Sequence, residues 1–418
     1  MKTALANATV ISCTGADPIA NGTVVIDGER IVYVGPTAGA PPADRVVDCA
    51  GKTITPGIVD AHAHLVYFEV SDSWSIELSK SIEEATVDAT LNAALLLRKG
   101  ITSIRDVGTR GTISITLRNA IAAGRLPGPR VKASKQIISV WGGLGDFHPT
   151  HVFKREQYMP ALCEIITGPW EARNAVRQQV KDGADWIKCE ASGTGFNAMC
   201  PADRDTMSFE ELQAIVDEAT AKNRPVACHS ESKGSIMKAA RAGVTTIEHA
   251  VYLDDESLEA VLAAGCAICP TLGLYSAFAW EGADFGIPAE VVANHQVTNE
   301  HHVASIRKAH EAGVTIIAGS DAGLTAFPQG GVLREICVYV ERVGMTPHEA
   351  LLTATRNSSR VIGLGDQVGT LETGKLADIL VLRENPLDRI RALAEPETVE
   401  AVLQGGVVVA GALPGAAR

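Results

Sequence analysis

The feature that most constrains the fold is an alternation, over the middle of the chain, of short apolar segments with alanine-rich segments of helical spacing. Residues 81–100, 170–183 and 208–223 have the helical spacing, and short apolar runs are typical of buried strands. Alternation of this kind predicts parallel β/α units. Eight strands are expected, at residues 58–65, 102–108, 130–139, 186–192, 225–230, 245–250, 267–272 and 315–323.

Eight such units favour an α/β fold of the (β/α)₈ TIM-barrel type. Four predicted helices run into a glycine just before the next strand, at Gly100, Gly243, Gly265 and Gly313, where a glycine is the expected helix C-cap. An open doubly wound sheet is the alternative. No GxGxxG motif follows the first strand, so dinucleotide binding has no support.

Both ends of the chain have a different texture. Short β-branched segments separated by Gly and Asp turns fill residues 1–56 and recur near the C-terminus. We therefore expect residues 1–56 and 366–418 to pair into one small β-sandwich domain. The barrel domain is expected at residues 57–365.

Composition excludes several classes of protein. Hydrophobic residues make up 46% of the 418 residues and charged residues 21%, which is typical of a globular enzyme. A net charge of -12 without a basic stripe argues against nucleic-acid binding. The first segment lacks the apolar core of a signal peptide, no apolar run reaches spanning length, and nine scattered cysteines fit a reducing compartment. A cytoplasmic protein without a membrane partner is expected.

Ionisable residues stand at the ends of the predicted strands, where a barrel carries its active site. His62 and His64 end the first strand, and their spacing places both imidazoles on one face because strand side chains have a period of two. Later strands end in Lys188, His229, His249 and Asp321. Each alone has an ordinary explanation as a core, ion-paired or capping residue. Together they favour a metal site, and imidazole with carboxylate suits zinc or a similar ion.

The segments PGIVDAHAHL, WIKCE, ACHS, IEHA and GSDAG resemble, in order and spacing, the signature of the amidohydrolase superfamily. The resemblance covers almost the whole chain. DWIKCEASG is most similar to the branch of prolidase-like and imidazolonepropionase-related proteins. The resemblance implies that His62, His64 and Asp321 hold the more buried of two divalent ions, expected to be zinc, and that His229 and His249 hold the other. Lys188, carboxylated by CO₂, would bridge them.

The resemblance also implies a mechanism. Two ions would lower the pKa of a bridging water toward ~7, so that a hydroxide attacks the substrate carbonyl. Asp321 would carry the proton to the leaving amine. The expected small-molecule substrate is a dipeptide or N-acyl amino acid, ochratoxin-type amides included. A carbamate, urea or lactone hydrolase, or a non-hydrolytic barrel that retains the metal site, are the alternatives.

Residues around the expected substrate depart from the branch pattern. Leu144 stands where similar sequences often have His, Glu231 where Tyr is common, and Gln329 where His is frequent. Glu231 is expected to pair either with a cationic group of the substrate or with Lys233 or Arg241. Arg334 either binds a substrate carboxylate or pairs with Glu335 or Glu341. Other loop residues that could contact substrate are Tyr67, Trp141, His148 and His151. His301 and His302 are expected to face solvent on a helix, and a homo-oligomer is compatible with the sequence.

Overall fold

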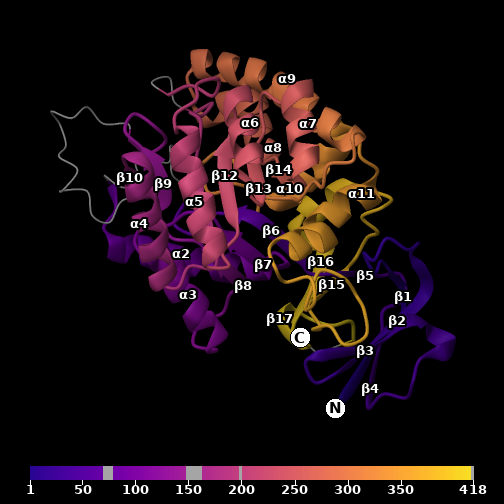
Figure 1. Cartoon of the computed structure of the whole chain (residues 1–418). Helices are drawn as coiled ribbons and strands as arrows, with labels where there is room; N and C mark the ends of the chain where they lie inside the picture. The colour runs from indigo at the N-terminus through magenta and orange to yellow at the C-terminus, as the bar shows by residue number, and fades with distance from the viewer. Residues whose placement is uncertain (69–78, 147–161, 197–199, 416–418) are drawn as a thin grey trace.

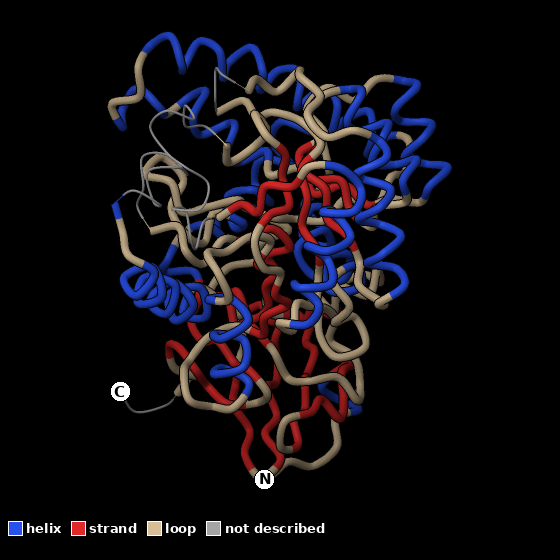
Figure 2. Tube along the Cα trace, turned by 60° about the vertical axis from the view of Figure 1, so that its left-hand side comes forward, coloured by secondary structure: helices blue, strands red, loops and turns tan. Residues whose placement is uncertain are grey.

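Parallel strands enclosed by helices make up most of the computed structural model, which describes residues 1–68, 79–146, 162–196 and 200–415 (Figure 1). His148 and His151 lie outside the described residues. One parallel sheet holds β6 (Ile58–Ala63), β7 (Ile101–Asp106) and β8 (Arg130–Ala133). The other has the order β10 (Cys163–Ile166), β9 (Ile137–Val140), β11 (Ile187–Glu190), β12 (Val226–Ser230), β13 (Thr246–His249) and β14 (Ala267–Cys269). In Figure 2 these strands lie inside the helices.

Backbone hydrogen bonds connect the two parallel sheets on both sides. On one side Asp185 N donates to the carbonyl of Ala133, at 2.7 Å. On the other, residues 315–318 bridge β14 to β6, because Ile317 N donates to Ile268 and Ala61 N donates to Ala318, both at 2.9 Å. Backbone hydrogen bonds therefore join the two parallel sheets at both of these places, and β10 stands at the edge beside β9, outside this path.

Two predicted strands differ from the observed elements. The third, residues 130–139, is split into β8 and β9, and β9 pairs with β10, which was not predicted. The eighth, residues 315–323, forms only an isolated bridge at Ile316. Beyond it, the amides of Ser320 and Asp321 both donate to the carbonyl of His62, and Asp321 has a φ of 52°. The chain thus leaves the extended conformation before Asp321, which a strand prediction does not anticipate.

Helices pack outside the strands, and the sequence sets their ends. Ser81 and Ser208 form capping boxes at α2 (Ile82–Arg98) and α5 (Phe209–Ala221). All four predicted glycine stops have positive φ, and Gly243 is the left-handed C-cap of α6 (Lys233–Ala242). The other helices are α3 (Ile113–Ala122), α4 (Gly168–Lys181), α7 (Asp255–Ala264), α8 (Leu272–Trp280), α9 (Ala289–Glu311), α10 (Val332–Val338), α11 (Pro347–Leu352) and α12 (Ser358–Val361).

The two ends of the chain pair in a separate sheet. β5 (Thr53–Pro56) pairs antiparallel with β15 (Ile379–Leu382), and β1 (Lys2–Val10) pairs with β5. The remaining strands are β2 (Ile19–Asp27), β3 (Arg30–Pro36), β4 (Arg45–Asp48), β16 (Val399–Gln404) and β17 (Val407–Gly411). Figure 1 shows this sheet to one side of the helices. One buried cluster, with Leu5 and Val24 from one end and Ile379 and Leu403 from the other, is its core.

The inner faces of the parallel strands change character along their length. Near the strand starts, apolar side chains form one buried cluster that includes Val59, Trp186, Ala227 and Ile317. At the carboxyl ends the side chains are ionisable, beginning with His62 on β6.

Among the described helices, none has the length and apolar character that crossing a bilayer requires.

Candidate active site

One cavity of about 390 Å³ opens at the carboxyl ends of the parallel strands. Six of the ionisable side chains that line it lie together, and we call them the floor: His62, His64, Lys188, His229, His249 and Asp321. All six were predicted from strand ends, and the structure brings them together although they span almost 260 residues of sequence. The fold alone accounts for this, because the carboxyl ends of parallel strands meet on one side.

On one side of the floor, two imidazoles face a carboxylate. Asp321 Oδ1 lies 3.3 Å from His64 Nε2 and 3.7 Å from His62 Nε2. This closeness requires Gly319 just before, since a Cβ there would lie 2.4 Å from the Cβ of His62. Donor atoms of these three side chains lie within 4.8 Å of one another, which is compatible with one shared cation.

The other two imidazoles, with Lys188 beside them, complete the floor. The rings of His229 and His249 are 4.5 Å apart, and those of His249 and His62 are 5.2 Å apart. Lys188 on β11 is 2% exposed, and its Nζ has no hydrogen-bond partner among the described residues. A buried ammonium without a partner is costly, so an additional group at this atom is expected.

Each imidazole of the floor has one ring nitrogen fixed by a hydrogen bond, which leaves the other for a cation. The four fixed nitrogens donate as follows: His62 Nδ1 to Glu248, His64 Nδ1 to the Gly108 carbonyl, His249 Nδ1 to Thr271 Oγ1, and His229 Nε2 to the Gly193 carbonyl. Burial lowers the pKa of His62 and His64 to about 4 and that of His229 to about 3, and it lowers the pKa of His249 well below its usual value. The rings are therefore neutral at pH 7, as metal ligands must be.

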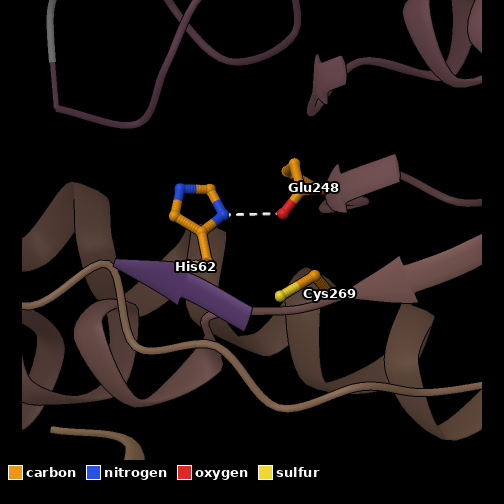
Figure 3. Close-up of side chains that lie close together, drawn as sticks. All are labelled: His62, Glu248 and Cys269. Atoms are coloured by element: carbon orange, nitrogen blue, oxygen red, sulfur yellow. Dashed lines mark hydrogen bonds and ion pairs between the residues drawn. The ribbon is translucent and has the colours of Figure 1, made fainter. Parts of the chain in front are cut away.

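Among these hydrogen-bond partners, Glu248 is itself held by a second charged side chain. Figure 3 shows Glu248 with His62. Its carboxylate accepts His62 Nδ1 at 2.7 Å and both of its oxygens accept from Arg105, at 2.9 Å each. Burial alone would raise the pKa of Glu248. The charge of Arg105 and the hydrogen bond from His62 outweigh burial and hold this pKa well below its usual range. Cys269 lies near this pair, but burial raises the pKa of its thiol well above the usual value. Glu248 therefore orients His62, and Cys269 stays a protonated neighbour.

Above the floor, the cavity is lined by aromatic residues that the sequence analysis did not identify. Phe196, Tyr275, Phe278 and His295 form what we call the aromatic wall. Tyr275 and Phe278 come from α8, and His295 from α9. Helical spacing gives no signal for them, since a helix residue that faces a cavity has the same period as one that faces the core.

Two of the predicted substrate residues line the cavity. The ring of Tyr67 stacks on His64 with centroids 4.7 Å apart. Leu144 also lines the cavity and contributes an apolar surface.

The prediction for Glu231 is wrong in its choice of partners. The side chain is fully buried behind His229, with Oε1 3.3 Å from His229 Nε2, and it accepts the hydroxyl hydrogen of Tyr275 at 2.6 Å. Lys233 instead pairs with Asp254, at 2.7 Å. Burial raises the pKa of Glu231 to about 8. The side chain contacts His229 of the floor and is not among the residues that line the cavity.

Three further candidates do not line the cavity. Gln329 is buried, and its amide donates to the carbonyls of His64 and Tyr67, each at 2.9 Å, so it holds the loop after β6. Arg334 forms an ion pair with Glu281, which corrects the predicted pairing with Glu335 or Glu341. Trp141 is 49% exposed and lies outside the cavity lining.

A further correction concerns the helix histidines. His301 is exposed as predicted, but His302 is buried and donates from Nε2 to the carbonyl of His249 at 2.7 Å. His302 thereby fixes the backbone of a floor residue. Adjacent positions on α9 face in different directions, and the sequence did not show which of them faces the strands.

Parallel strands with imidazole, lysine and carboxylate side chains gathered at their carboxyl ends define an α/β enzyme of the hydrolase class. The chain matches the Amidohydrolase family over residues 53–409. It is 32% identical to ochratoxinase from Aspergillus niger over 94% of this chain and 84% of that protein. The chain therefore belongs to the amidohydrolase family, and it is a hydrolase that acts on carbon–nitrogen bonds.

Solved structures place it within that family. A prolidase complexed with N-methylphosphonate-L-proline superposes with a TM-score of 0.87 at 31% identity, over 98% of this chain and 99% of that one. A Xaa-Pro dipeptidase with bound methionine superposes with a TM-score of 0.85 at 28% identity, over the same shares, 98% and 99%. The predicted resemblance to the prolidase-like branch is confirmed.

Proposed function

We propose that this enzyme hydrolyses the amide bond of a dipeptide or of an N-acyl amino acid, ochratoxin-type amides included. One observation carries the proposal: four neutral imidazoles, a carboxylate and a lysine without a partner among the described residues converge in one cavity. The names of the similar proteins, ochratoxinase, prolidase and Xaa-Pro dipeptidase, support an amide or peptide substrate.

The floor fits a pair of divalent cations, zinc by the chemistry of its donors. His62, His64 and Asp321 would hold one ion, His229 and His249 the other, and Lys188 carboxylated by CO₂ would bridge them. The Lys188 Nζ without a described partner fits a side chain that an added carboxyl group completes. When bound, the ions would polarise the substrate carbonyl and lower the pKa of water toward ~7.

Asp321 is the residue placed to move the proton. Its side chain is 18% exposed and lines the cavity, and its Oδ1 is 3.3 Å from His64 Nε2. We propose that this carboxylate accepts the proton of the attacking water and delivers it to the leaving nitrogen. An amine leaves a tetrahedral carbon readily only when it is protonated, so this transfer is required for amide cleavage.

The proposal is tested by metal analysis together with Lys188→Ala. The purified enzyme should hold about two divalent ions per chain and hydrolyse a member of a panel of Xaa-Pro dipeptides and N-acyl amino acids. Lys188→Ala should lose both properties, while Lys181→Ala, which alters an exposed lysine, should keep them. A metal-loaded enzyme that cleaves carbamates, ureas or lactones but no amide in the panel contradicts the proposal.

The same geometry supports a proposal on domains. We propose that residues 57–365 form a (β/α)₈ barrel, and that residues 1–56 and 366–418 form a β-sandwich. The hydrogen bonds on both sides of the parallel sheets support the barrel, and the pairing of β5 with β15 supports the β-sandwich.

The cytoplasmic location of the protein and its assembly into a homo-oligomer stay predictions.

A further inference from the structure

The imidazole of His295 is buried in the cavity without any described hydrogen-bond partner. The residue is 1% exposed and lines the cavity, and neither Nδ1 nor Nε2 bonds to a described residue. Buried polar groups in native proteins almost always have a partner. His302, seven residues further along the same helix, does bond through Nε2. Among the described residues, both ring nitrogens of His295 are therefore left available to a bound ligand.

Aromatic rings surround this imidazole. The ring centroid of Phe196 lies 4.6 Å away, that of Phe278 5.2 Å and that of Tyr275 6.1 Å. The Tyr275 hydroxyl donates to Glu231, so this tyrosine presents its ring and not its polar end. Apolar side chains continue the surface on both sides, namely Leu274, Phe285, Ile287 and Val291.

Charge is confined to the floor. Among the described lining residues, Lys188 and Asp321 are the charged side chains, and both belong to the floor. The region around His295 thus offers an aromatic and apolar surface in which its imidazole is a polar group. Such a surface fits an aromatic ring that carries one hydrogen-bonding substituent.

We propose that His295 determines substrate specificity, by hydrogen-bonding an uncharged hydroxyl or carbonyl group on an aromatic part of the substrate. The proposal rests on amide hydrolysis as the function of the site, and it names the chemical class of the group that the aromatic wall receives. Burial lowers the pKa of His295 to about 4, so its ring is neutral at pH 7 and offers one N–H and one lone pair. A phenolic hydroxyl can both donate and accept, and therefore matches either nitrogen.

Binding of two small amides separates this role from catalysis. Benzamide and 4-hydroxybenzamide differ only in one phenolic hydroxyl, and calorimetry with the metal-loaded enzyme measures both. We expect the wild type to bind 4-hydroxybenzamide about tenfold more tightly, which is the effect of one net hydrogen bond. In His295→Phe the preference should vanish, while benzamide binding changes by less than about threefold, since the ring volume is retained. His295→Gln, which keeps a donor and an acceptor, should restore part of the preference.

His301→Phe is the matched control, because it makes the same substitution on the exposed side of α9 and should leave the preference intact. A preference that survives in His295→Phe overturns the proposal, as does a wild type that binds neither amide at millimolar concentration. Failure of amide hydrolysis is a different result: the hydroxyl preference would persist in binding, but no N-acyl amino acid would be cleaved.

Discussion

The floor and the aromatic wall line the same cavity, yet they are stabilised in different ways. Floor imidazoles each have a fixed hydrogen-bond partner, and Glu248 in turn is held by Arg105. The wall has rings in mutual contact and, at His295, no described partner. Hydrogen bonds fix the orientation of the floor imidazoles, whereas the wall offers mainly ring surfaces to a ligand. We infer that reaction and specificity are set by different elements: strand ends for the first, α8 and α9 for the second.

Asp321→Asn should have the largest effect and tests the floor. The substitution keeps the size of the side chain but removes its charge and its capacity to accept a proton. We expect kcat/KM on the best amide substrate to fall by about 10⁴-fold, the order seen when one catalytic carboxylate is removed. Steady-state kinetics with metal content measured in parallel provide the test. A loss smaller than tenfold would assign the proton transfer to another group.

The sequence predicted the floor and missed the wall, and the reason is geometric. Residues such as His62 and Lys188 stand at strand ends, and parallel topology converts that position into convergence. The supporting pair was also visible in principle, since Arg105 and Glu248 are charged residues inside apolar strands and must pair if buried. Position on α9 carries no such information, because His295 and His301 differ only in the side of the helix that faces the cavity.

Other errors came from local backbone conformation. The eighth strand was expected to reach residue 323, but the amide of Asp321 turns to the carbonyl of His62, with φ at 52°. A positive φ at an aspartate depends on contacts from a segment far away in sequence. Strand patterns therefore located Asp321 correctly and assigned the wrong conformation to it.

Glu248→Gln tests whether the support of the floor acts through His62. A glutamine can still meet Nδ1 but removes the charge that Arg105 and His62 share, so the imidazole becomes a weaker ligand. We expect metal affinity, measured by competition with a chelator, to fall by about 10- to 100-fold. Glu190→Gln is the control, because Glu190 is also buried at a strand end but accepts from Ser139 and Thr206 and from no histidine. Equal losses in both variants would mean that burial of a carboxylate, and not the contact with His62, is responsible.

The smallest effect on rate is expected at Glu335, which anchors the wall. Its carboxyl accepts the amides of Leu272, at 2.8 Å, and Gly273, at the start of the α8 helix that supplies Tyr275 and Phe278. Burial raises its pKa from 4.5 to about 8; Asp60 adds to this, while the backbone amides and Tyr339 oppose it. The folded state then binds more protons than the unfolded state between these pH values, so the free energy of unfolding falls as pH rises from 4.5 to 8.

Glu335→Gln should remove that dependence while leaving kcat at its optimum within about twofold, since no floor residue is altered. Urea unfolding at pH 5 and at pH 8 measures it: the variant should gain stability relative to the wild type at the higher pH, by the order of ~1.4 kcal/mol for each unit of pKa shift. The difference between the two proteins is the quantity to compare, because other groups titrate equally in both. If the free energy of unfolding had the same pH dependence in Glu335→Gln and in the wild type, Glu335 would be ionised in the folded protein. The wall would then be held by a charge at the start of α8, as the floor is held by the charge of Glu248.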